Sequence, residues 1–182
     1  HQRIATVTLP PSLDHSQSDF LDGAAAKDLM AGLPASVPQR VPRARLEAFA
    51  SVGLTPSQIA VCPIVTREHA YEAGKKLLSL PPAERPTAIV CQADVYAWGV
   101  WDAARDLGMR VPQDVSITGF DGLTEGVFAA LDLTSVVQDG TEKGRLIARW
   151  VTLACEGPDA PPPFDLPLSV RWGTSAGPAP QS

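Results

Sequence analysis

Residues 86–122 follow the pattern of a strand, a helix and a second strand, and no other part of the chain constrains the fold as strongly. The segments are an apolar run at 87–91, helical periodicity at 97–107 that ends at Gly108, and an apolar run at 115–120. Two strands joined by one helix in so few residues should be parallel and share a sheet. Gln92, Asp94 and Asp121 would then lie at its carboxyl edge, where open α/β sheets bind ligands.

The remaining sequence continues the alternation of strands and helices. Further strands are expected at 4–9 and 59–65, both rich in β-branched residues, and helices at 66–80 and from about 139 to 157. Thr66 is expected to cap the first of these helices and Asp139 or Thr141 the second, in which Leu146, Trp150 and Leu153 form one face. The predicted fold class is therefore α/β, an open and mostly parallel sheet with helices on both faces.

Short motifs recur in a fixed order along the chain. They are HQRIA at 1–5, RLEAF at 45–49, QAD at 92–94, AWG at 97–99, GMRVPQD at 108–114, GFDG at 119–122, LTSVVQ at 133–138, EKGR at 142–145, LP at 166–167, Arg171 and Thr174. Each is weak alone, but together they resemble the C-terminal part of the effector-binding core of LacI/GalR-type bacterial transcriptional regulators. The resemblance implies a lobe of the periplasmic-binding-protein-like type I fold.

This resemblance also implies a division of the chain. Residues 1–138 correspond to the C-terminal subdomain, with an insertion or long loop at 10–42; residues 139–157 form a helix after the crossover that packs on an N-terminal subdomain; residues 158–182 hold the final strand and a tail. A chain of 182 residues is too short for a DNA-binding module and a complete two-lobed core. The helix-turn-helix headpiece and most of the first subdomain are expected to precede His1.

Charge and composition limit the classes of partner. The formal net charge of -5 and the pI near 5.1 argue against a nucleic-acid surface on this chain, so operator DNA is expected to bind only through a headpiece outside it. No apolar run reaches the roughly 18 residues of a membrane helix. The chain is expected to be soluble and cytoplasmic; the alternative is export through a secretion signal upstream of His1. Cys62, Cys91 and Cys155 are expected to be buried, reduced thiols, and no metal or cofactor is expected.

Asp121 and Arg45 are the first candidates for ligand contact, as the resemblance also implies. A carboxylate and a planar guanidinium can each engage the vicinal hydroxyls of a sugar through charge-assisted hydrogen bonds. Each residue also has a structural interpretation, Asp121 as the cap of a turn and Arg45 as a solvated surface group. A different alignment of the motif, through residues 20–23, would place Phe20 where the arginine belongs.

Three polar residues near the edge complete the predicted ligand site. Gln138 follows a strand and can bond a ligand or bridge the crossover. Many family members have Asn before Asp94, whereas this chain has Ala93, which has no hydrogen-bonding side chain. Gln92 can reach the same space, or the ligand is less hydroxylated than a hexose. Asp94 itself can either bind ligand or cap the following helix.

Trp98 and Trp101 lie three residues apart, on one face of the expected helix. Two interpretations stand: burial in the core, or a homodimer interface, which is where the family's corresponding helix lies and where aromatic anchors are enriched. Tyr96 is a weaker candidate for the same interface.

Three function classes follow from these observations. The leading prediction is the effector-binding and dimerisation part of a LacI-type regulator that senses a small, polar, sugar-like ligand. The alternative is a solute-binding protein of a sugar transport system. An enzyme is not predicted, because His1, His15 and His69 form no recognisable motif with a Ser or Cys nucleophile and no Gly-rich phosphate loop occurs.

Overall fold

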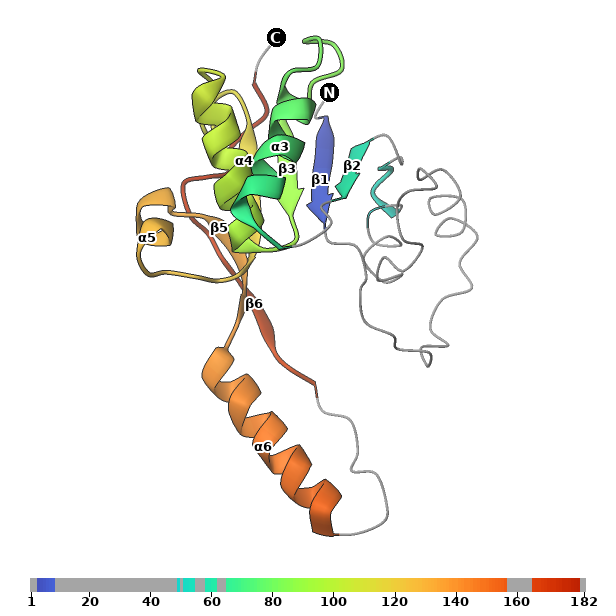
Figure 1. Ribbon diagram of the computed structural model, residues 1–182, viewed down its shortest axis with the longest axis vertical. Coiled ribbons are helices and arrows are strands. Elements are labelled where there is room, and N and C mark those ends of the chain that lie inside the picture. Colours follow the sequence, from blue (N-terminus) through green and yellow to red (C-terminus); the bar gives the residue numbers. More distant parts are fainter. Residues whose placement is uncertain are drawn as a thin grey trace.

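A single mixed sheet organises the protein (Figure 1). The computed structural model describes residues 3–8, 49, 51–54, 58–61, 65–156 and 165–180. Within these residues the sheet has the strand order β2-β1-β3-β4-β5-β6. The strands are β1 Ile4–Thr8, β2 Ile59–Val61, β3 Ala88–Cys91, β4 Ser116–Asp121, β5 Thr134–Gln138 and β6 Leu168–Arg171. All neighbours are parallel except β5 and β6, which confirms the predicted α/β class.

The helices of the described residues are α3 Arg67–Leu78, α4 Asp94–Asp106, α5 Val127–Leu131 and α6 Gly140–Glu156. Thr66 caps α3 as predicted, since its Oγ1 accepts a hydrogen bond from the His69 amide at 3.3 Å. Helix α4 begins at Asp94, three residues before the start predicted from periodicity, and the short α5 was not predicted. Asp139 rather than Thr141 caps α6, because its Oδ1 accepts from the Glu142 amide at 3.0 Å.

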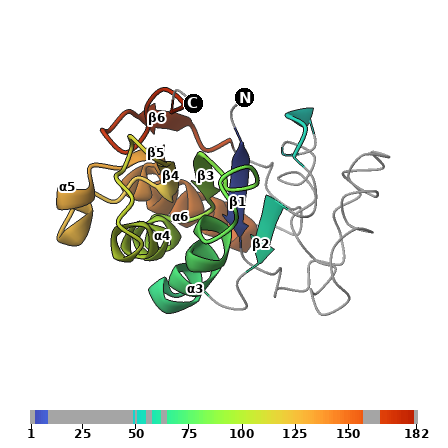
Figure 2. The ribbon, with the colours of Figure 1, turned by 90° about the horizontal axis from the view of Figure 1, so that it is seen from above.

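Helices α3 and α4 cover one face of the sheet and bury it (Figure 2). Tyr96, Val100, Ile89 and Ile117 are completely buried there. Gly99 permits the helices to approach closely, because a Cβ at this position would overlap the carbonyl oxygen of Arg67. Arg45 and the expected insertion at 10–42 lie outside the described residues.

Helix α6 leaves the carboxyl edge of the sheet and points away from it (Figure 1). Its apolar side chains Ile147, Trp150, Val151 and Leu153 are exposed, so this helix contributes little to the core of the described residues. Cys155 near its end is a free, exposed cysteine, which makes the prediction of a buried thiol wrong at this position. The same prediction is confirmed for Cys91, which is buried and in no disulfide, while Cys62 lies outside the described residues.

Candidate functional site

Asp121 ends strand β4 with an unusual backbone conformation. Its φ angle is +118°, and Gly122 follows with a φ of +76°. A positive φ costs a residue with a Cβ of order 1–3 kcal/mol, and such strain concentrates at binding and catalytic sites. Gly122 is required for a second reason, because a Cβ there would overlap Val137 of the neighbouring strand. The chain therefore accepts strain at the point where the predicted ligand carboxylate leaves the sheet.

The side chain of Asp94 holds the loop after Asp121. It is completely buried; its Oδ2 accepts from the Leu123 amide at 2.6 Å and its Oδ1 accepts from the Ser135 hydroxyl at 2.7 Å. Neither predicted role fits these contacts. The N-cap of α4 is Ala93, with no side-chain cap bond, and a fully buried carboxylate with both oxygens engaged is not presented to a ligand. Asp94 thus positions the edge, and we withdraw it from the ligand-contacting set.

Two further residues, Ser135 of β5 and Arg171 of β6, hold the same loop. The Ser135 hydroxyl accepts from the Gly122 amide at 3.2 Å. The Arg171 guanidinium donates to the carbonyls of Leu123 at 3.0 Å and Leu133 at 3.3 Å. The peptide units after Asp121 are therefore held from β5 and β6 as well as from α4. Both residues belong to predicted motifs, Ser135 to LTSVVQ at 133–138, but neither contact with the loop was predicted.

Gln138 at the end of β5 lies beside Asp121. Its Nε2 donates to Asp121 Oδ1 at 3.3 Å, and its Oε1 accepts from Lys143 Nζ at 3.1 Å. Gln138 and Asp121, both candidates for ligand contact, therefore lie within hydrogen-bonding distance of each other. Lys143 belongs to the EKGR motif at 142–145, and its contact with Gln138 depends on the turn of the chain between β5 and α6.

Gln92 lines a cavity of about 350 Å³, together with Phe120, Val136, Trp172 and other residues of β3 to β6. The lining is mostly apolar. Side chains alternate between the faces of a strand, and Ser135 bonds Asp94 of α4, so its neighbour Val136 points to the opposite face. The cavity consequently lies on the face away from α3 and α4. Of the predicted ligand residues that the structure describes, Gln92 is the one that borders it.

Arg45 lies outside the described residues. Its predicted contact with the ligand, and the competing alignment through Phe20, both remain predictions. The described part of the site consists of Asp121, Gln138 and Gln92 at the edge.

The predicted interface residues on α4 divide into two kinds. Tyr96 is completely buried, so it belongs to the core and we withdraw it from the interface. Trp98 and Trp101 are half-buried and pack against the core from outside. The Trp98 ring meets Phe128 edge-to-face at 5.9 Å, and the Arg67 guanidinium lies 4.6 Å from the Trp98 ring centroid. Both tryptophans therefore keep part of their surface exposed in this chain.

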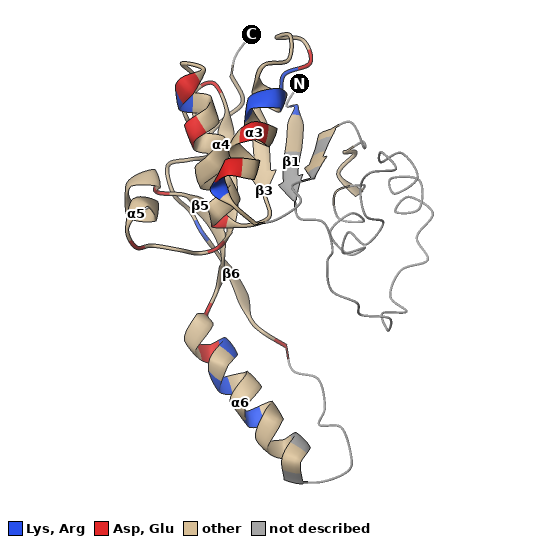
Figure 3. Cartoon of the chain, in the orientation of Figure 1, with Lys and Arg blue, Asp and Glu red and all other residues tan. Residues whose placement is uncertain are grey.

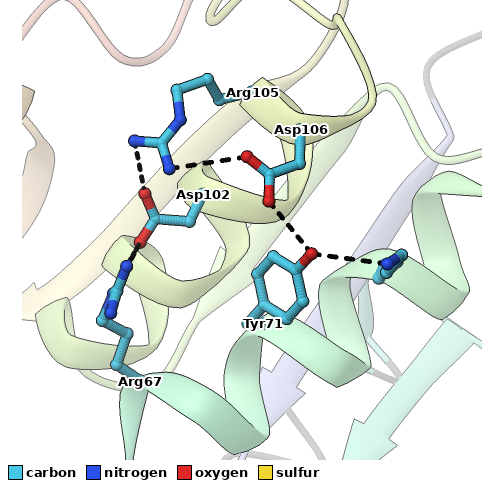
Figure 4. Close-up of polar contacts among 6 residues, drawn as sticks. Arg67, Tyr71, Asp102, Arg105 and Asp106 are labelled. Atoms are coloured by element: carbon cyan, nitrogen blue, oxygen red, sulfur yellow. Dashed lines mark hydrogen bonds and ion pairs between the residues drawn. The ribbon is translucent and has the colours of Figure 1, made fainter.

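A polar network joins the outer surfaces of α3 and α4 (Figure 4). The buried Asp102 carboxylate forms ion pairs with Arg67 at 2.5 Å and with Arg105 at 2.7 Å. The Tyr71 hydroxyl donates a hydrogen bond to Asp106 at 3.1 Å. A buried carboxylate needs such partners, because an unpaired charge is expensive away from water. The network holds the two helices in register beside Trp98.

Charged side chains of the described residues lie mainly on helices and connecting loops (Figure 3). Hydrogen bonds from the side chain and backbone of Arg110 lower the pKa of Asp114 to about 2. A hydrogen bond from Arg145 likewise lowers the pKa of Glu142 on α6.

In the described part of the chain, no group of His, Cys, Asp and Glu side chains is arranged to hold a metal ion, and no helix is long and apolar enough to cross a membrane.

Residues 29–175 match the model of the periplasmic binding protein-like domain family. The chain belongs to this family. Among curated relatives, the HTH-type transcriptional regulator IpsA of Corynebacterium glutamicum is 28% identical over 180 residues, which cover 98% of this chain and 48% of IpsA. The chain thus spans about half the length of this relative.

Solved structures agree with the family assignment. A LacI family transcriptional regulator from Bifidobacterium animalis subsp. lactis superposes with a TM-score of 0.70 at 26% identity, covering 98% of this chain and 56% of that protein. A LacI family regulator from Lactobacillus casei, with bound glucose, shares the fold with a TM-score of 0.65 at 24% identity, covering 97% of this chain and 57% of that protein. The predicted resemblance to LacI/GalR-type regulators is confirmed, and this periplasmic binding protein-like chain corresponds to their effector-binding part.

Proposed function

We propose that this periplasmic binding protein-like chain forms the effector-sensing and dimerisation half of a LacI-type transcriptional regulator. Its effector is a small, polar, sugar-like molecule bound at the carboxyl edge of the sheet. The observation that carries the proposal is Asp121, held at a φ of +118° beside Gln138. A carboxylate and an amide placed together can accept from and donate to the hydroxyls of one ligand.

The arrangement around Asp121 supports binding over a purely structural role. Asp94, Ser135 and Arg171 together fix the peptide units that follow it. Such a clamp maintains a strained residue in one orientation, and pre-organised polar groups lose less free energy when a ligand binds. The glucose bound in the Lactobacillus casei regulator is consistent with a sugar-like ligand for this fold.

We propose the following arrangement of the chain. Residues 1–138 form the C-terminal subdomain, with 10–42 as an insertion or long loop, and residues 158–182 return as the last strand and tail. Helix α6, within 139–157, packs its exposed apolar side chains Ile147, Trp150 and Leu153 on an N-terminal subdomain outside this chain. Effector binding between two lobes then favours one lobe arrangement, by no more than its difference in affinity for the two.

The regulator acts in the cytoplasm as a homodimer in this proposal, with the half-buried Trp98 and Trp101 at the interface. Operator DNA binds through a headpiece outside the chain, in keeping with the acidic net charge of -5. A solute-binding protein of a transport system shares the fold, but the curated relative is a transcriptional regulator. That relationship also favours a binding role over an enzymatic one.

Two measurements test the proposal. Thermal unfolding of the full-length protein in a panel of neutral sugars, beginning with glucose and sucrose, should identify a compound that raises the melting temperature. The same compound should change the affinity of the full-length protein for operator DNA, while the 182-residue chain alone shows no salt-dependent DNA binding. Stabilisation without any effect on DNA binding would support the transport alternative instead.

A further inference from the structure

Lys143 is joined to the Asp121 edge through a single side chain. The Lys143 ammonium contacts Gln138 Oε1 at 3.1 Å, and Gln138 Nε2 contacts Asp121 Oδ1 at 3.3 Å. We propose that Lys143 is a positioning residue that fixes the orientation of the Gln138 amide, and thereby the donor that Gln138 presents beside Asp121. Its role in ligand binding rests on the proposed function.

The argument follows from the hydrogen-bonding capacity of the three groups. An ammonium only donates and an ionised carboxylate only accepts, whereas a glutamine amide donates from one end and accepts at the other. With Lys143 on one side and Asp121 on the other, one of the two amide orientations satisfies both neighbours. The reversed orientation would direct N–H groups at Lys143 and a carbonyl oxygen at Asp121, so two unfavourable contacts would replace two favourable ones.

The backbone places Lys143 where this contact is possible. The Lys143 amide donates to the Asp139 carbonyl at 2.9 Å, in the first turn of α6, and Asp139 also caps that turn. The acid nearest to Lys143 on the same helix, Glu142, is paired with Arg145 at 2.5 and 2.8 Å. Lys143 is thus supplied by the helix that leaves the lobe, while Gln138 and Asp121 belong to the sheet.

This orientation has a consequence for the ligand. A hydroxyl placed between Gln138 and Asp121 would accept from the amide and donate to the carboxylate, which uses both of its hydrogen-bonding functions. An ether or a fluorine at the same position cannot donate. Lys143 therefore contributes to selectivity for hydroxyl groups without contacting the ligand.

Side-chain amide NMR of the 15N-labelled 182-residue chain tests the orientation without any ligand. The Gln138 NH₂ signals are assigned by their absence in Gln138→Glu. We expect Lys143→Met to shift these signals toward the values of a solvated amide, and Lys143→Arg to preserve them because a guanidinium also only donates. Lys76→Met, an exposed lysine of α3, is the matched control. Unchanged Gln138 signals in Lys143→Met, or equal shifts in Met and Arg variants, would overturn the proposal.

Binding of glucose to the full-length protein provides the functional readout. We expect Lys143→Met to weaken it roughly tenfold, as for loss of about one hydrogen bond, and Lys143→Arg to restore most of the affinity. A folded Lys143→Met variant with shifted Gln138 signals and unchanged glucose affinity would overturn the selectivity role. If wild-type protein binds no sugar of the panel, the proposed function fails, and the amide signals alone still decide whether Lys143 orients Gln138.

Discussion

Two regions of the molecule differ in backbone strain and in packing. One is the face of the sheet beneath α3 and α4, and the other is the carboxyl edge beside α6. On the helix-covered face, side chains such as Tyr96 and Val100 are completely buried, and the buried carboxylate Asp102 is paired with two arginines. At the edge, a non-glycine residue adopts a φ of +118° and three other residues hold it there. Packing in the first region stabilises the fold. In the second region, backbone strain lowers the stability of the fold while it places one carboxylate, which is typical of a binding site.

The largest effect is expected from packing on the helix-covered face. Gly99→Ala should destabilise the protein by about 3 kcal/mol, because the added Cβ overlaps the Arg67 carbonyl and forces α3 and α4 apart. Gly144→Ala on α6, where a Cβ meets nothing within 4 Å, should instead stabilise by up to about 1 kcal/mol through helix propensity. Urea unfolding followed by circular dichroism measures the free energy of unfolding of both variants. If both substitutions changed it in the same direction, the proposed difference in packing between α4 and α6 would be wrong.

A smaller loss of stability is expected where the two regions meet. Asp94→Ala should cost about 2 kcal/mol, since it leaves the Leu123 amide and the Ser135 hydroxyl without their acceptor. Asp94→Asn keeps one acceptor oxygen and should cost less. Chemical unfolding gives the two values, and amide hydrogen exchange should show faster exchange at Leu123 in the Ala variant. Protection at Leu123 equal to wild type would mean that Asp94 does not hold the loop.

The outer surface of α4 is expected to mediate self-association. Trp98→Glu should weaken the homodimer roughly tenfold or more, because a charge replaces a half-buried aromatic anchor, whereas Lys76→Glu at an exposed position of α3 should leave it intact. Sedimentation of the full-length protein and both variants measures this. If the Trp98→Glu protein unfolds, the ring belongs to the core. If the variant dimerises as wild type does, the outer surface of α4 is not the dimer interface.

The smallest effect concerns the exposed Arg110–Asp114 pair. The pKa of Asp114 falls from 3.8 to about 2 on folding, so the ionised carboxylate contributes stability above about pH 4 that is lost as the pH falls through 2. Asp114→Asn should lower the melting temperature by roughly 1–2 °C at neutral pH, and less in high salt. The difference from wild type should shrink as the pH falls below 4 and vanish only below about pH 2. A constant difference across this range would assign the effect to something other than the ion pair.

The sequence predicts the sheet and its helices well because periodicity and capping are local. Thr66 and Gly108 mark helix ends through their own hydrogen bonding and backbone freedom, and the parallel order follows from the short connections. The site is less predictable. Whether Asp94 contacts ligand or supports a loop depends on Ser135 and Leu123, which are distant in sequence, and the strain at Asp121 depends on the strands around it. The contact of Lys143 likewise requires the angle at which α6 leaves β5.

Asp121→Gly tests the central claim, that strain at the carboxyl edge serves ligand binding, because it separates stability from function. Glycine adopts positive φ without a steric penalty, so the variant should fold with equal or greater stability than wild type. Loss of the carboxylate should weaken binding of the stabilising sugar by roughly ten- to a hundredfold in calorimetry on the full-length protein, while Asp114→Gly, a surface control, leaves it unchanged. A destabilised Asp121→Gly protein that binds the sugar as tightly as wild type would contradict the account.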